Sequence, residues 1–195
     1  FPGFDDTMAD LKLVCFGDFQ VTLSRSRVTA FQTDKTRALL VYLSVDRQEH
    51  QRAALARFFW PGYSDESARN SLRQSLHQLR QLLRDDEADP PWLVISRQTV
   101  QINLVAPIHV DVVLFQQLIA ACATHNHSAL TTCAPCLARL RQAVDLYRGD
   151  FLTDFIVDDS DPFEEWRRII QEQLHVQMLD ALTQLAIAAE ADGDS

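Results

Sequence analysis

The segment SDESARNSLRQSLHQLRQLLR, residues 64–84, carries the clearest pattern in this chain of 195 residues. Its apolar residues recur at intervals of three and four, as on one face of an α-helix; they are Ala68, Leu72, Leu76, Leu79 and Leu83. Ser64 and Ser67 are both suitable N-caps, because a serine oxygen can accept a hydrogen bond from a free backbone N–H of the first turn. The pattern predicts an amphipathic helix that runs to about Arg84.

A second stripe of this helix is basic. At about 100° per residue it lies beside the apolar stripe, and its members are Arg69, Arg73, His77, Arg80 and Arg84. The next exposed positions hold Asn70, Gln74 and Gln81, and no acidic residue lies between Ser67 and Arg84. Arginine neutralises phosphate, and Arg, Asn and Gln make paired hydrogen bonds with base edges. The stripe is therefore suited to an anionic groove, and a solvated or internally paired face is the alternative interpretation.

Short strands and two further helices precede this helix. The strands are predicted from runs rich in Val, Leu and Phe, at residues 11–17, 19–23 and 27–31. The first helix is predicted to begin after a cap at Thr33 or Asp34. The second covers residues 52–60 and is stopped by Pro61-Gly62.

A hairpin follows the basic helix. Residues 85–91 predict a solvated acidic turn, and residues 92–96 and 100–104 predict the two strands. Strands, three helices and a hairpin form the order of a winged-helix domain, whose third helix enters the DNA major groove. In that arrangement Arg97 at the hairpin tip and Lys35 near the start of the first helix are candidate DNA contacts, although both are also ordinary solvated charges.

The second half of the chain is predicted to be all helical. Amphipathic patterns cover residues 110–123, 136–147 and 163–191. They predict a helical domain over residues 106–195 behind a winged-helix domain over residues 11–105. A stack of helical hairpins fits this pattern, although no sequence repeat is visible.

Composition supports two modules with different partners. The formal net charge is −9, but residues 11–84 hold 12 basic and 6 acidic residues, whereas residues 106–195 hold 5 basic and 14 acidic ones. Apolar residues make up 47% of the chain, which excludes disorder as its main state. No segment has the length and apolarity of a membrane span, and no secretory signal is visible. We therefore expect a cytoplasmic protein without a membrane partner.

Several segments together resemble one bacterial family. In the first half the segments are LLVYL at 39–43, LARFFWP at 55–61 and ARNSLRQSLHQLR at 68–80. In the second half they are HVDVVLF at 109–115, LYRGDFL at 146–152 and FEEW at 163–166. They resemble SARP-type bacterial transcriptional activators, in which an OmpR-like winged helix precedes a bacterial transcriptional activator domain.

The resemblance implies a fold, partners and the absence of a catalytic site. The fold would be an α+β winged helix followed by an all-α, TPR-like domain. The partners would be double-stranded promoter DNA and RNA polymerase. The third helix would read the promoter, with two copies of the protein bound to direct repeats. The loop at residues 61–64 corresponds to the polymerase-contacting loop of OmpR-like activators. Because the helical domain is shorter than usual in the family, we expect an N-terminal part of a longer STAND-type regulator.

On this basis the expected DNA-binding residues are Arg69, Asn70, Arg73, Gln74, His77, Arg80, Arg84, Arg97 and Lys35. Asn70 and Gln74 fit bases and phosphates equally, and His77 can be a bystander on the stripe. The alternative function is a protein-interaction module whose winged helix no longer binds DNA and whose acidic helical half is the working surface.

Four cysteines leave one further question open. Cys15 lies in an apolar run and is expected in the core. Cys133 and Cys136 form a C-x-x-C motif close to His125 and His127. Such residues can hold zinc or, at a helix start, act as a redox pair. The family pattern requires neither, so we expect no metal and no cofactor.

Overall fold

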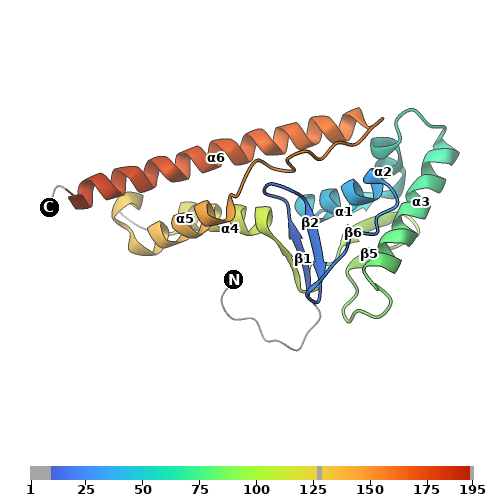
Figure 1. Cartoon of the computed structure of the whole chain (residues 1–195), viewed down its shortest axis with the longest axis horizontal. Coiled ribbons are helices and arrows are strands. Elements are labelled where there is room, and N and C mark those ends of the chain that lie inside the picture. The colour runs from blue at the N-terminus through green and yellow to red at the C-terminus, as the bar shows by residue number, and fades with distance from the viewer. Residues whose placement is uncertain (1–9, 127–128, 194–195) are drawn as a thin grey trace. The chain divides into compact units, whose positions relative to one another are not determined.

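The structure is a computed structural model that describes residues 10–126 and 129–193 (Figure 1). By their internal contacts these residues form two compact units that interleave along the chain. Among the described residues, unit 1 contains residues 10–13, 20–110 and 155–166, and unit 2 contains residues 14–19, 111–154 and 167 onward. The sequence instead divides the chain once, between residues 105 and 106, and that division stays a prediction. None of the described helices is long and apolar enough to cross a membrane.

A four-stranded sheet begins unit 1. Its strands are ordered β3-β2-β1-β7, and they comprise β1 (Leu11–Val14), β2 (Gln20–Leu23), β3 (Ser26–Arg27) and β7 (Ile108–Val110). The predicted third strand is shorter than expected, because residues 28–31 lie outside any strand. The sequence did not predict β7, which pairs in parallel with β1, Leu11 opposite Ile108. A parallel partner about a hundred residues away leaves no local turn signal.

Three helices follow, and they are α1 (Asp34–Asp46), α2 (Arg52–Phe59) and α3 (Asp65–Leu82). Thr33 caps α1, because its side chain accepts a hydrogen bond from the Thr36 backbone N–H. Ser64, rather than Ser67, is the N-cap of α3 and accepts from the Ser67 backbone N–H. The three predicted helices of this half are therefore confirmed.

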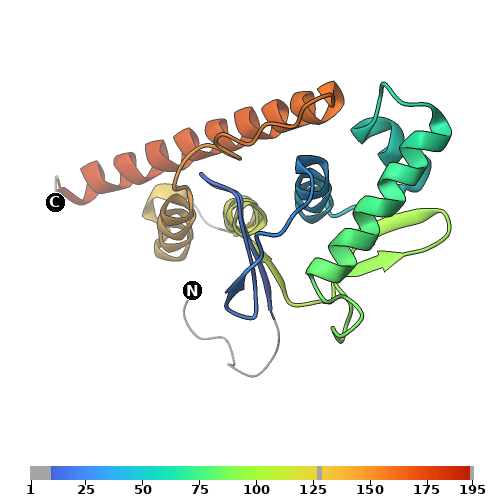
Figure 2. The ribbon, with the colours of Figure 1, turned by 45° about the vertical axis from the view of Figure 1, so that its right-hand side comes forward.

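The predicted hairpin is also present. Strands β5 (Leu93–Ile95) and β6 (Thr99–Ile102) pair antiparallel, and β6 also pairs with the short β4 (His50–Gln51). Figures 1 and 2 both place α3 next to this hairpin. Trp92 is buried before β5, and its indole N–H donates to the Leu83 carbonyl oxygen at 2.9 Å. The order of strands, three helices and a hairpin is that of a winged helix.

Unit 2 is helical, as predicted. It contains α4 (Asp111–Thr124), the short 3-10 helix η1 (Leu130–Thr132), α5 (Ala134–Leu146) and the part of α6 (Asp161–Gly193) that follows Trp166. Residues of all three α-helices share one apolar core, and its buried members are Cys122, Cys136, Leu140 and Ala181. Burial of this core is the main force holding the three helices together.

A buried carboxylate fixes the segment of residues 14–19 within unit 2. Asp111 is 7% exposed and accepts hydrogen bonds from the backbone N–H groups of Cys15, Phe16 and Val112 at 2.8–3.0 Å. Burial raises the pKa of this carboxyl, and the backbone hydrogen bonds oppose that shift. Cys15 is fully buried, which confirms its expected place in the core.

Candidate nucleic-acid interface

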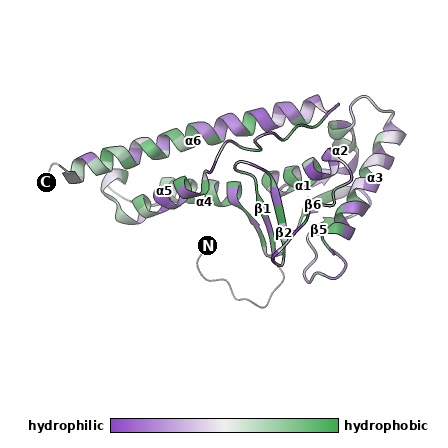
Figure 3. Ribbon diagram, in the orientation of Figure 1, coloured by the Kyte–Doolittle hydropathy of each residue, from purple (hydrophilic) through white to green (hydrophobic). Residues whose placement is uncertain are grey.

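Helix α3 is held in unit 1 by its apolar face. Ala68, Leu72, Leu76 and Leu79 are each at most 3% exposed, as the helical spacing predicts. The buried Ser75 hydroxyl also accepts a hydrogen bond from Thr36 of α1 at 3.1 Å. Figure 3 shows hydrophilic and hydrophobic residues interspersed along α3. Fixing one face in this way makes the opposite face a rigid exposed surface.

The acidic start of α3 is partly neutralised. Asp65 receives two hydrogen bonds from the Arg57 guanidinium, at 3.3 and 3.1 Å. This contact lowers the pKa of Asp65 and raises that of Arg57. Asp65 and Glu66 also lie in the first turn of α3, where negative charge is favoured by the helix dipole.

The basic stripe is exposed over the first three turns of α3. Arg69, Asn70, Arg73, Gln74 and His77 are all exposed. Within the part of the chain that the structure describes, neither Arg69 nor Arg73 forms an ion pair. We call these five residues the free face of α3. It can present two guanidinium groups and two amides to a ligand without first breaking an ion pair, although the Arg69 charge also helps to lower the pKa of Asp65 one turn earlier.

Arg80 differs from the other stripe residues because it is paired internally. Its Nε donates to Asp85 at 3.3 Å, and its guanidinium also contacts Asp86. The other Asp85 oxygen accepts from the backbone N–H groups of Trp92 and Leu93 at 2.7 and 3.0 Å. Asp85 is only 4% exposed, so the prediction of a wholly solvated turn at 85–91 is wrong at this residue.

Arg84 lies beyond the helix that was predicted to contain it. Helix α3 ends at Leu82, Leu83 is the C-cap, and Arg84 has a left-handed φ of 49°. The side chain is exposed, but it does not continue the stripe at helical spacing.

Lys35 is engaged within unit 1. Its amine donates to the Asp159 carbonyl oxygen at 3.0 Å and lies 5.9 Å from the Trp60 ring centre and 5.6 Å from that of Tyr63. Partial burial lowers the pKa of Lys35, and the charges of Asp159 and Asp158 oppose that shift. The amine would have to leave these partners to reach a phosphate.

The hairpin tip presents Arg97. A compact turn holds the tip, in which the Ser96 hydroxyl oxygen accepts from the backbone N–H groups of Gln98 and Thr99. Arg52 also donates its backbone N–H to the Gln98 carbonyl oxygen at 2.8 Å, which ties the tip to the start of α2. Arg97 is exposed on this turn, as expected for a wing residue.

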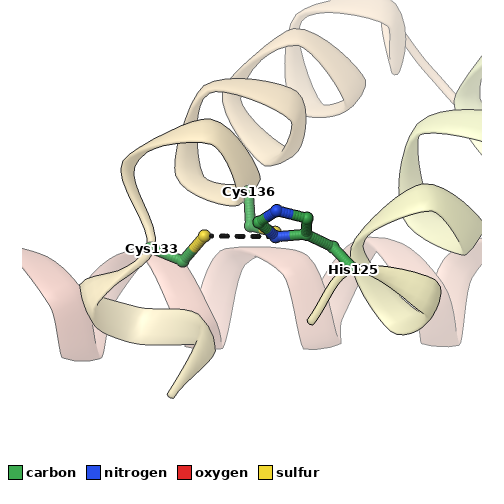
Figure 4. A group of neighbouring side chains, drawn as sticks. All are labelled: His125, Cys133 and Cys136. Carbon is green, nitrogen blue, oxygen red and sulfur yellow. Dashed lines mark hydrogen bonds between the residues drawn. The ribbon is translucent and has the colours of Figure 1, made fainter. Parts of the chain in front are cut away.

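A second group of residues singled out by sequence converges in unit 2. His125, Cys133 and Cys136 place one ligand atom each within 4.8 Å of one another. Figure 4 shows the imidazole of His125 reaching the two cysteine side chains. Among the described residues, these three form a group that could hold a metal ion; His127 lies outside the described residues.

Two comparisons with known proteins bear on the chain. Residues 110–194 match the bacterial transcriptional activator domain. The fold is similar to that of Mycobacterium tuberculosis EmbR, solved in complex with a low-affinity phosphopeptide, with a TM-score of 0.69 and 24% sequence identity. The match covers 95% of this chain and 46% of that one, so this chain spans about half the length of its structural relative. No curated protein matches the sequence.

The comparisons agree with the domain order predicted from the sequence. The structural match extends over both the winged helix and the helical part, which confirms an α+β winged helix followed by a helical domain. The family match lies on the helical part. Residues 110–194 therefore match a bacterial transcriptional activator domain and follow a winged helix, which is the domain order of the SARP-type activators that the sequence resembles.

Proposed function

We propose that the chain is a sequence-specific, double-stranded DNA-binding activator of transcription, with α3 in the major groove. The free face of α3 carries this proposal, because it is rigid, exposed and without an acidic residue. Arg69 and Arg73 would bind phosphates or guanine edges, and Asn70 and Gln74 would bind bases or phosphates. No catalytic step and no cofactor is needed for this activity.

The internal contacts rank the remaining candidates. Arg97 is exposed at the hairpin tip and would contact phosphate or the minor groove. Arg80 is neutralised by Asp85 and Asp86, and Lys35 is held by the Asp159 carbonyl oxygen. These two residues would therefore contribute less to DNA affinity than Arg69 and Arg73.

The other proposed partners follow from the family. The transcriptional activator domain would support RNA polymerase contact, regulation and pairing of two copies on direct repeats. The loop at residues 61–64 is exposed, as a polymerase-contacting loop must be. The proposed place of action is the cytoplasm, and the proposed whole protein is a longer STAND-type regulator.

The test measures binding of the chain to upstream fragments of the source genome. Binding is followed by fluorescence anisotropy of the DNA at two salt concentrations. A retained fragment that survives competitor DNA would serve as the specific site. Arg73→Ala should then weaken specific binding by about 1–3 kcal/mol if Arg73 pairs with a base. Each lost phosphate contact should lower the salt slope by about 0.9.

Two variants serve as controls. Arg141→Ala removes an exposed arginine of α5 in unit 2 and should leave DNA binding unchanged. Arg80→Ala should have a smaller effect than Arg73→Ala, because its charge is already paired. If Arg69→Ala and Arg73→Ala both bind as wild type, α3 is not the recognition helix. If no fragment is retained at physiological salt while a protein partner is, the interaction-module alternative holds instead.

A further inference from the structure

The C-x-x-C motif and a histidine from another helix end meet at one point in unit 2. His125 directly follows the end of α4, Cys133 is the N-cap residue of α5, and Cys136 lies in the first turn of α5. The Nδ1 atom of His125 is 3.4 Å from the Cys133 Sγ and 3.2 Å from the Cys136 Sγ. One nitrogen therefore faces two sulfurs (Figure 4).

These separations are close to those of ligands around one tetrahedral metal ion. With a Zn–S bond of about 2.3 Å and a Zn–N bond of about 2.05 Å, a tetrahedral angle places the nitrogen about 3.6 Å from each sulfur. The observed distances are shorter by a few tenths of an ångström. A small outward movement of the imidazole would make room for the ion between the three atoms.

The surroundings act on the thiols in opposite directions. Cys136 is fully buried and Cys133 is half-buried; removal from water disfavours a charged thiolate, so the bound metal would itself supply the main compensating charge. An Arg139 guanidinium N–H points at the Cys136 Sγ at 3.8 Å, which favours the negative charge of a thiolate. Cys122 contributes to the same core and donates its thiol hydrogen to the Cys136 carbonyl oxygen at 3.6 Å.

The context is less suitable for a dithiol redox pair. A thioredoxin-like C-x-x-C follows a strand in a βαβ arrangement, whereas η1 precedes Cys133 here. In a redox pair the histidine would activate one of the thiols, whereas a nitrogen in contact with both sulfurs matches ligands that share one ion. A three-ligand metal site uses all three side chains.

We propose that His125, Cys133 and Cys136 bind a zinc ion through Nδ1 and two thiolates, with the fourth position left for water or another ligand. Binding would release the two thiol protons to solvent and would link the end of α4 to the start of α5 across the intervening loop. The site would stabilise the transcriptional activator domain and does not depend on DNA binding.

The test is the metal content of the full untagged chain, purified under reducing conditions without chelator. We expect about one zinc per chain by elemental analysis. After removal of the metal, titration with Co²⁺ alone should produce a thiolate-to-cobalt charge-transfer band that saturates at one equivalent, and Zn²⁺ should abolish it. Zinc should also raise the unfolding temperature of the stripped protein.

Variants separate the site from general loss of structure. His125→Ala and Cys133→Ser change half-buried residues and should lose the cobalt band while retaining the circular dichroism of the wild type. His175→Ala removes an exposed histidine of α6 and should bind cobalt like the wild type. Cys136→Ser is less informative, because its side chain is in the core.

Two results would overturn the proposal. One is a reduced wild-type chain, with all thiols free, that takes up neither zinc nor cobalt. The other is metal binding that survives both His125→Ala and Cys133→Ser. A Cys133–Cys136 disulfide that forms and is reduced reversibly in a chain without metal affinity would assign the pair to redox chemistry instead.

Discussion

Replacing Asp111 by asparagine should loosen unit 2 at a defined point. The two Asp111 oxygens accept from three backbone N–H groups, those of Cys15, Phe16 and Val112. Asparagine keeps one acceptor oxygen and places an NH2 group where the other oxygen lies. If the oxygen stays with Cys15 and Val112, the buried Phe16 N–H faces another donor.

The size of the effect follows from these contacts. A buried donor left without its acceptor costs about 1–3 kcal/mol, and the remaining bonds lose the roughly twofold strength that the charge gave them. Because burial raises the pKa of Asp111, removing the charge also relieves a desolvation cost and offsets part of the loss. We therefore expect a net destabilisation of about 2–3 kcal/mol.

Hydrogen exchange at neutral pH is the appropriate assay, because Trp60, Trp92 and Trp166 all lie in unit 1 and their fluorescence does not report directly on Asp111. The amides of residues 15–17 should exchange about 30–140 times faster in Asp111→Asn. Asp145→Asn is the matched control, an exposed carboxylate of α5 in the same unit. The reasoning fails if exchange of residues 15–17 accelerates no more in Asp111→Asn than in this control.

Three further predictions concern stability and titration. Asp85→Ala leaves two backbone N–H groups of the wing without their acceptor and should destabilise unit 1 by about 2–4 kcal/mol, measured by tryptophan fluorescence in denaturant. Gly17 has a φ of 81°, which an alanine adopts only with strain, so Gly17→Ala should lower the free energy of unfolding by about 1–2 kcal/mol. Circular dichroism in denaturant measures this loss, which should exceed that of Gly62→Ala, where an added Cβ meets open space. Burial and the Asp150 carboxylate raise the pKa of Tyr147 from 10.0 to about 12; ultraviolet titration should show this late ionisation, and Tyr147→Phe should remove it. Because the folded-state pKa is raised, the stability that this phenol contributes is present below pH 10.0 and is lost as the pH rises toward about 12.

Local patterns were sufficient to predict the helices but not the pairing of distant strands. The three-and-four spacing of leucines predicted α3. The sequence offered Ser64 and Ser67 as N-caps, and Ser64 is the one that the structure uses. The ends were less certain, because Leu83 and Arg84 continue the apolar and basic spacing although the helix has already ended at Leu82. Strand β7 was missed since its three residues, Ile108–Val110, pair with β1 and have no adjacent turn to mark them.

Buried polar residues were the hardest to predict. Asp85 lies in a run of acidic residues, and Asp111 lies at the start of an amphipathic helix. Carboxylates at such positions are usually exposed to solvent. Each is buried because backbone N–H groups from another segment need an acceptor. That requirement depends on tertiary structure, so a single sequence contains no local signal for it. The convergence of His125 with Cys133 and Cys136 was more accessible, because metal-ligand residue types at short spacing are themselves a signal.

The structure also changes how the basic stripe is weighed along its length. Helical spacing alone treats Arg69, Arg73 and Arg80 as equivalent. The acids that neutralise Arg80 come from the turn after the helix, and Asp85 is fixed there by the wing. Unpaired charge is therefore concentrated in the N-terminal turns of α3, among Arg69, Arg73 and their neighbouring amides. In helix-turn-helix proteins the N-terminal residues of the recognition helix contact the base edges. The ion pairs of Arg80 thus leave the N-terminal turns of α3 as the basic part of the helix, and the proposed binding mode requires these turns. The net charge of −9 for the whole chain does not show this local excess of basic residues.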